Sequence, residues 1–139
     1  MADISHISDG ATEGTPEGAG ARYTTIAAYE SAQQGTLTTP NQFVLHDNYT
    51  GGLSEDNVVF DGWVTTQTNK IQGYAAPGAE YDYITDTGSK IVGIDTITPA
   101  TIRIGIDVHM DLTGLGVFAQ SGGASSALDA RTNSIDEYY

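Results

Sequence analysis

The clearest pattern of apolar and polar positions begins directly after Pro99. Aliphatic side chains occupy every second position there: Ile102, Ile104, Ile106 and Val108. Polar side chains alternate with them: Thr101, Arg103, Asp107 and His109. A period of two with β-branched residues on one face predicts a strand over residues 101–109. We expect its aliphatic face to lie in the core and its polar face, with Arg103, Asp107 and His109, to be exposed and available for interaction.

Shorter strand-like runs precede this segment, at intervals of about ten residues. They span residues 41–49, 58–63 and 70–74, and residues 81–97 are compatible with two more short strands. Loops rich in Gly, Pro, Asn and Asp separate them. The remaining predicted core residues come from these runs: Phe43, Leu45, Val58, Phe60, Trp63 and Ile71. This spacing predicts an all-β fold, either a short β-helix-like domain or a β-sandwich.

One short helix is expected near the N-terminus, over residues 24–35. Thr24 or Thr25 can cap its start, and Gly35 suits the position just past its end. Ile26 and Tyr29 are three positions apart and give it a narrow apolar stripe. A helix of about ten residues is not stable alone, so we expect it to cover an exposed β-edge.

The two ends of the chain differ from its middle. Residues 1–21 are small, acidic or glycine and predict a flexible N-terminal arm, in which Ile4 and Ile7 would anchor a neighbouring subunit. Residues 22–120 would form the β domain, and residues 121–139 a polar C-terminal tail. Two aromatic residues at the end of that tail, Tyr138 and Tyr139, are further candidate contacts. Because the chain begins with Met, we expect a complete small gene product.

Composition excludes several classes of partner. Eighteen acidic residues against five basic ones give a formal charge of −13, which disfavours binding to nucleic acid or to an anionic membrane surface. The absence of cysteine excludes disulfides and thiolate metal sites. No apolar run approaches the roughly 20 residues that span a bilayer. We therefore expect no membrane partner and no cofactor.

Candidate chemistry is sparse. Asp107 and His109 could join a serine in a hydrolytic set, but no nucleophile elbow occurs. Oxygen-rich loops could hold calcium, yet no Asp-x-Asp-x-Asp-Gly loop is present. The three histidines show no metal-ligand spacing, so we expect them to be isolated. Trp63 could stack against a sugar, although core packing is its commoner role. We expect no catalytic residues and no metal ligands.

Residues 23–73 resemble the opening segment of right-handed parallel β-helix proteins of the pectin-lyase-like type. The stretches that carry the resemblance are YTTIAAYESAQQG (23–35), NQFVLHDNY (41–49), VVFDGW (58–63) and NKIQG (69–73). The resemblance implies a helix that covers the open N-terminal end of a solenoid. It also implies that Trp63 lies at a corner of an early coil. Because family members with enzyme activity place their catalytic residues in later coils, the resemblance carries a fold and no reaction.

These observations favour a non-enzymatic virion structural protein. A short acidic β domain with loose ends is typical of a phage head decoration (cement) protein, which would bind the major capsid protein or other virion subunits on the outer capsid surface. We expect such a module to be a homotrimer. The alternative is a carbohydrate-binding or carbohydrate-degrading β-helix module of a tail fibre, a spike or a secreted protein.

Overall fold

The structure, a computed structural model, describes residues 3–10, 16–17, 20–55, 57–93, 100–119 and 126–130. Within these ranges the chain forms one short helix, α1 (Ile26–Gln33), and a series of short strands. The strands are β1 (Asp3–Ile7), β2 (Pro16–Glu17), β3 (Gly20–Tyr23), β4 (Asn41–Leu45), β5 (Leu53–Glu55), β6 (Val58–Phe60), β7 (Ile71–Ala75), β8 (Lys90–Gly93), β9 (Ala100–Ile104), β10 (Met110–Thr113), β11 (Gly116–Phe118) and β12 (Ser126–Ala130).

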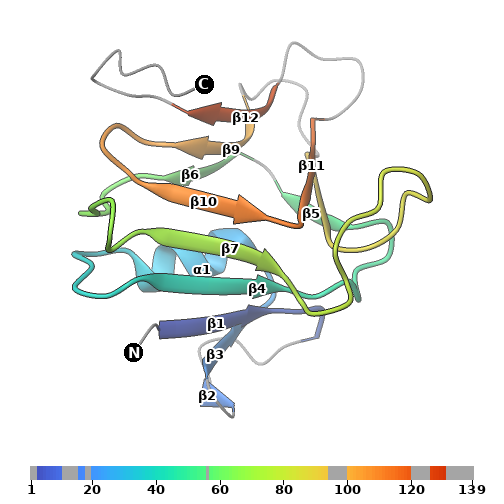
Figure 1. Cartoon of the computed structure of the whole chain (residues 1–139), viewed down its shortest axis with the longest axis horizontal. Helices are drawn as coiled ribbons and strands as arrows, with labels where there is room; N and C mark the ends of the chain where they lie inside the picture. Colours follow the sequence, from blue (N-terminus) through green and yellow to red (C-terminus); the bar gives the residue numbers. More distant parts are fainter. Residues whose placement is uncertain are drawn as a thin grey trace.

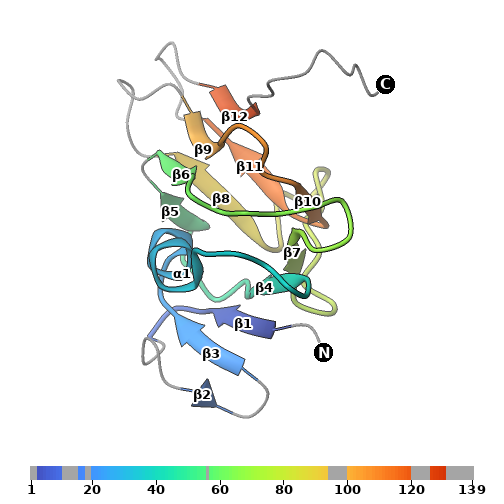
Figure 2. The ribbon, with the colours of Figure 1, turned by 90° about the vertical axis from the view of Figure 1, so that its left-hand side faces the viewer.

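From β4 onward, successive strands fall into different sheets, so the backbone winds as a solenoid. β4, β5 and β6 lie in three separate sheets, and β7–β9 and then β10–β12 repeat this cycle in the same order. The pairing between coils is parallel, with Asn41 opposite Ile71 and Ile71 opposite Met110. The stack of β4, β7 and β10 is visible in Figure 1, and Figure 2 shows the coils above one another. The predicted all-β fold with one short helix is confirmed, and its topology is that of a short β-helix rather than a sandwich.

The core lies inside the coils and follows the period-two pattern. In β4, Asn41, Phe43 and Leu45 point inward, while the residues between them are only partly buried. The later strands and the corner after β6 add further aliphatic and aromatic side chains to the core: Leu53, Val58, Phe60, Trp63, Ile71, Ile91, Ile102 and Ile104. The apolar area that they bury together supplies the main driving force for folding.

Helix α1 covers the N-terminal end of the core, and β1 and β3 extend the first sheet beyond β4. The helix contacts β6, β3 and β1 (Figure 2). Its N-cap is Thr25, whose side-chain oxygen accepts a hydrogen bond from the backbone N–H of Ala28 at 3.0 Å. Ile26 and Tyr29 are its buried residues, as the sequence predicts. Covering the end in this way protects strand edges that would otherwise pair with other chains.

The N-terminal segment differs from the predicted flexible arm. β1 lies between β3 and β4 and pairs with both in parallel, over Ile4–Ile7 and Asp3–Ile7 respectively. Ile7 is fully buried in the core, so it is not available as an anchor for a neighbouring subunit. At the other end, β12 pairs with β9 within the predicted tail. Tyr138 and Tyr139 lie outside the described residues.

The strand predicted over residues 101–109 is also corrected. β9 ends at Ile104, and Gly105 begins a corner in which Asp107 has a φ of +61°. Ile102 and Ile104 are buried as predicted, but Ile106 is 51% exposed. Val108 is partly buried and packs against the core. The alternation of apolar and polar residues in the sequence therefore spans the end of β9 and the corner that follows it, rather than one continuous strand.

Candidate interaction surface

Trp63 is a core residue at a corner of the first coil, not an exposed sugar platform. Its side chain is 5% exposed, and its ring lies 6.2 Å from that of Tyr29 and 6.4 Å from that of Phe60. The indole N–H donates a hydrogen bond to Glu30 of α1 at 3.1 Å. A ring face enclosed by the helix cannot stack on a sugar. Trp63 instead joins the helix to the first coil, as the predicted corner role requires.

The predicted polar face of Arg103, Asp107 and His109 is not one surface. Arg103 lies on β9, whereas Asp107 and His109 lie in the corner before β10. His109 is held by Thr65, whose hydroxyl lies 3.1 Å from its Nδ1 and accepts a hydrogen bond from its backbone N–H at 2.7 Å. These contacts tie the corner to the preceding coil.

Two open hollows flank this corner instead. One, of about 270 Å³, is lined by residues that include Asp61, Arg103 and Ile106. The other, of about 330 Å³, is lined by residues that include Lys70, His109 and Asp111. Lys70 and Asp111 form a salt bridge beside it. Both hollows are lined by charged and aliphatic side chains.

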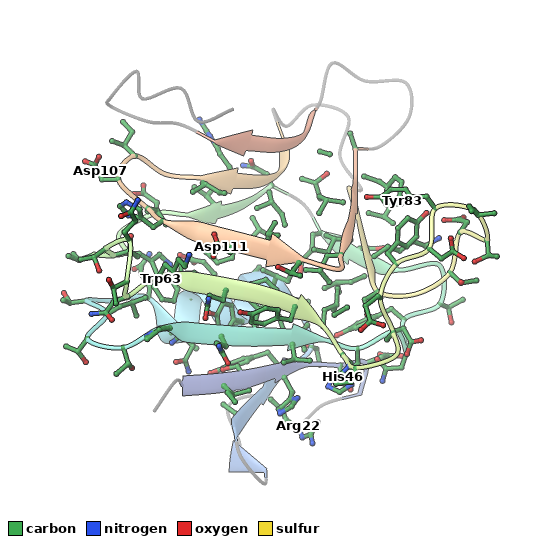
Figure 3. The ribbon with its side chains drawn as sticks, in the orientation of Figure 1. Arg22, His46, Trp63, Tyr83, Asp107 and Asp111 are labelled. Atoms are coloured by element: carbon green, nitrogen blue, oxygen red, sulfur yellow. The ribbon has the colours of Figure 1, made fainter. Side chains whose placement is uncertain are left out.

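A loop between β7 and β8 projects from the opposite side of the molecule, as the positions of Tyr83 and Asp107 in Figure 3 show. Its base is fixed to the solenoid by several hydrogen bonds. Ser89 is buried, and its hydroxyl donates to the carbonyl of Leu45 at 2.9 Å. The backbone N–H of Tyr81 donates to the carbonyl of Gly114 at 2.9 Å. The loop is thereby attached to two different coils.

Side chains then brace the loop from within. The Tyr81 hydroxyl donates to Asp86 at 2.6 Å, and Lys90 forms a salt bridge with the same carboxylate oxygen at 2.9 Å. Asp82 accepts a hydrogen bond from the backbone N–H of Ile84 and one from the Thr85 hydroxyl, both at 2.8 Å. These bonds hold the pKa of both aspartates below the usual value. Both carboxylates therefore stabilise the loop through these hydrogen bonds.

The tip of this loop presents two large apolar side chains to solvent. Ile84 is 94% exposed and Tyr83 is 75% exposed. The Tyr83 ring packs edge-on against Tyr81, with centroids 4.7 Å apart, and Tyr81 packs against Phe118 of β11. The tip is thus presented on a braced support. We call these two residues the Tyr83–Ile84 tip.

The Tyr83–Ile84 tip is not among the contact residues predicted above, although the sequence carries a signal for it. Tyr83 and Ile84 stand between Asp82 and Asp86, and aspartates commonly form local turn hydrogen bonds. If residues 82–87 form a turn, both Tyr83 and Ile84 are expected to be exposed. If they formed a strand, one of the two side chains would point into the core. The bridge between Asp82 and Thr87 closes this turn.

Two histidines that were expected to be isolated lie together. The Nδ1 of His6 on β1 and the Nε2 of His46, which directly follows β4, share a hydrogen bond at 3.1 Å. Among the described residues, no group of three or more His, Cys, Asp or Glu side chains is arranged to hold a metal ion. The helix of the described residues is too short and too polar to cross a bilayer.

Comparison with known proteins adds no relative. The chain matches no family model, no curated protein and no solved structure. The resemblance of residues 23–73 to pectin-lyase-like β-helix proteins therefore stays a prediction from the sequence.

The Tyr83–Ile84 tip is a candidate contact for another macromolecule. Interfaces gain most from a few aromatic or aliphatic side chains that become fully buried. A residue held by its own support loses little conformational freedom on binding, which leaves more of the contact energy for affinity. The Tyr83–Ile84 tip meets both conditions.

Proposed function

We propose that the chain is a non-enzymatic structural protein of a virus particle, a head decoration protein that stabilises the capsid through protein–protein contacts. In this role it lies on the outer capsid surface, contacts the major capsid protein or another virion subunit, and acts as a homotrimer. The observation that carries the proposal is the Tyr83–Ile84 tip, which exposes an aromatic and an aliphatic side chain on a braced loop.

The energetics of the tip support a role in assembly. Two side chains of this size bury enough apolar surface on docking to contribute roughly 1.5–3 kcal/mol each. In a decoration protein that is present in many copies, such modest contacts accumulate over the shell. The brace of Tyr81, Asp86 and Lys90 keeps the tip in one arrangement before contact.

The charge of the chain supports a position on the outside of the shell. A formal charge of −13 repels a packaged nucleic acid, so contact with the genome is unfavourable. The same charge steers the chain toward a basic patch on a partner protein. Contacts of this kind weaken as salt is added, whereas docking of the apolar tip does not depend on salt in this way.

Cosedimentation of the purified chain with assembled shells tests the proposal. The shells are those of the virus whose capsid gene lies in the same genome as the gene for this chain. We expect wild-type protein to pellet with shells, and the double variant Tyr83→Ser, Ile84→Ser to pellet much less. The matched control is Val64→Ser, because Val64 is an exposed apolar residue of another loop, 58% exposed. Equal pelleting of the tip variant and the control would contradict the role of the tip.

Oligomeric state and sugar binding provide the second arm of the test. Analytical ultracentrifugation is expected to show a trimer, and a monomer that never pellets with shells would overturn the proposal. Binding to an oligosaccharide array by the same monomeric protein would instead favour the carbohydrate-binding alternative.

A further inference from the structure

The parallel pairing of β1 with β4 brings two imidazole rings together. His6 lies on β1, and His46 follows directly after β4, 40 positions later in the sequence. The backbone N–H of His46 donates to the carbonyl of Ile7 at 3.0 Å, which extends the β1–β4 ladder to this point. The ring centroids are 5.4 Å apart, and the planes are inclined by 39°. Both rings are partly buried, and His46 lies at the end of β4 in Figure 3.

The distance between the ring nitrogens suits a shared metal ion. Zinc binds imidazole nitrogen at about 2.0–2.1 Å in a tetrahedral shell, which places two ligating nitrogens about 3.3 Å apart. An octahedral shell with bonds of similar length brings them to about 2.9 Å. The distance of 3.1 Å between Nδ1 of His6 and Nε2 of His46 lies between these values. In the structure the two nitrogens face each other at hydrogen-bond distance, so both rings have to turn about their side-chain bonds before their lone pairs point at one ion.

Several neighbouring groups act on the pKa of the two imidazoles. Burial lowers the pKa of both rings, and the guanidinium of Arg22 lowers it further. His46 also lowers the pKa of His6, while the Asp47 carboxylate acts in the opposite direction on His46. Arg22 comes from β3 and stands opposite His6 in the sheet. A neutral imidazole carries a proton on one nitrogen, so metal binding requires both rings to adopt the tautomer whose proton lies on the nitrogen away from the partner ring.

We propose that His6 and His46 together bind one borderline transition-metal dication, of the class of zinc, nickel or copper. Imidazole nitrogen prefers these ions, whereas calcium and magnesium prefer oxygen ligands. Water occupies the remaining coordination positions. The bound ion links β1 to the first coil, because one ligand lies on each side of the β1–β4 ladder. The metal therefore stabilises the N-terminal end of the solenoid.

We expect this site to bind its metal ion weakly and reversibly. Two protein ligands bind a metal less tightly than the four of a structural zinc site. The nearby Arg22 charge opposes a dication, which weakens the site further. We expect saturable binding of one ion per chain.

Titration of zinc or nickel ions into the full chain by calorimetry tests this inference, at a pH above the ordinary histidine value of 6.5. We expect one ion per chain and a rise in Tm that EDTA reverses. His6→Gln and His46→Gln should each weaken binding by about tenfold or more, comparable to losses around other metal sites. The matched control, His109→Gln, should bind as the wild type does, and calcium should not bind at this site.

Two results would overturn the inference. One is the lack of saturable zinc or nickel binding by the wild-type chain, and the other is undiminished binding by His46→Gln. If either glutamine variant fails to fold, NMR of the wild-type imidazole resonances decides instead. Zinc should then shift the signals of His6 and His46 and leave those of His109 in place; the reverse pattern would also refute the site. None of these readouts depends on binding to viral shells.

Discussion

A carboxylate oxygen of Glu55 lies 2.5 Å from the backbone nitrogen of Ile26, in the first turn of α1. Glu55 is the last residue of β5, and its side chain is 4% exposed. The backbone N–H of Ala27 also bonds to this side chain. The first N–H groups of a helix lack partners within the helix, and an acidic group there interacts favourably with the helix dipole. Glu55 therefore fixes the covering helix to the first coil from inside the protein.

We predict that the charge of Glu55 makes the fold less stable as the pH rises. Burial raises the pKa of Glu55 to about 7, against the opposing effect of the Ile26 and Ala27 hydrogen bonds. An unfolded chain releases this proton near 4.5, so the contribution of Glu55 is complete below 4.5 and is lost by about pH 7. The shift corresponds to roughly 3 kcal/mol at most.

Glu55→Gln supplies the comparison, because an amide oxygen still accepts the helix N–H groups but does not titrate. We expect the variant to lose this part of the pH dependence and to be more stable than the wild type above pH 7. Urea unfolding at a series of pH values measures both chains. Parallel profiles for the two chains would contradict the prediction. The lowered pKa values of Asp82 and Asp86 act in the opposite direction in both proteins, so only the difference between them is informative.

We predict that Trp63→Ala destabilises the whole domain. Removing a buried aromatic side chain leaves a cavity and typically costs about 3–5 kcal/mol. The change also removes the hydrogen bond to Glu30 and two ring contacts, with Tyr29 and Phe60. Trp63→Phe keeps most of the apolar area, so it should cost much less. Thermal unfolding followed by circular dichroism compares them, and a fully folded Trp63→Ala chain of unchanged Tm would show that this corner is not part of the core.

We predict that Tyr29→Phe lowers the free energy of unfolding by less than Trp63→Ala does. The Tyr29 hydroxyl donates to Asn41 at 2.7 Å in a buried position, and Asn41 in turn donates to Gln33 at 3.3 Å. Removing one partner leaves the buried Asn41 oxygen unsatisfied, which typically costs about 1–3 kcal/mol. Chemical denaturation with an unchanged m-value is the expected result. Because the ring remains, a loss as large as that of Trp63→Ala would contradict the assignment of the effect to the hydrogen bond.

The helix and the first coil are predictable from sequence because each carries a local signal. Thr25 and Gly35 bracket an apolar stripe, and Phe43 and Leu45 stand two apart in a strand that begins a coil. Trp63 is predictable as a corner because a large ring beside Gly62 needs a pocket, and α1 supplies it. These features depend on residues that are close together in the sequence, so a single sequence is enough to predict them.

Other features depend on residues distant in the sequence and could not be predicted in this way. β1 carries only two aliphatic residues, Ile4 and Ile7, and it becomes a strand by pairing with residues 41–45. His6 and His46 are likewise joined only by that pairing. The pattern around Ile106 misleads for a different reason. A period of two continues through Gly105 and Asp107, where the positive φ of Asp107 turns the backbone and exposes Ile106.

We predict that the loop bearing the Tyr83–Ile84 tip depends on the glycine at position 88. Gly88 has a φ of +100°, and a Cβ there would lie 2.4 Å from the backbone oxygen of Glu80. Gly78 has a similar φ of +78°, but a Cβ there meets nothing within 4 Å. Both alanine variants therefore carry backbone strain of about 1–2 kcal/mol, and only Gly88→Ala also has to displace the backbone at the base of the loop.

Comparing Gly88→Ala with Gly78→Ala separates the steric clash with Glu80 from the backbone strain that both variants share. Gly88→Ala should lower the free energy of unfolding by clearly more than Gly78→Ala, and it should weaken cosedimentation with shells because the base of the loop moves. Amide hydrogen exchange at Tyr81 and Asp82 provides a local measure, since their N–H groups bond to Gly114 and Thr87 in the braced loop. Equal stability and equal exchange in the two variants would show that the loop accommodates the added methyl group. The position of the tip would then not depend on this contact.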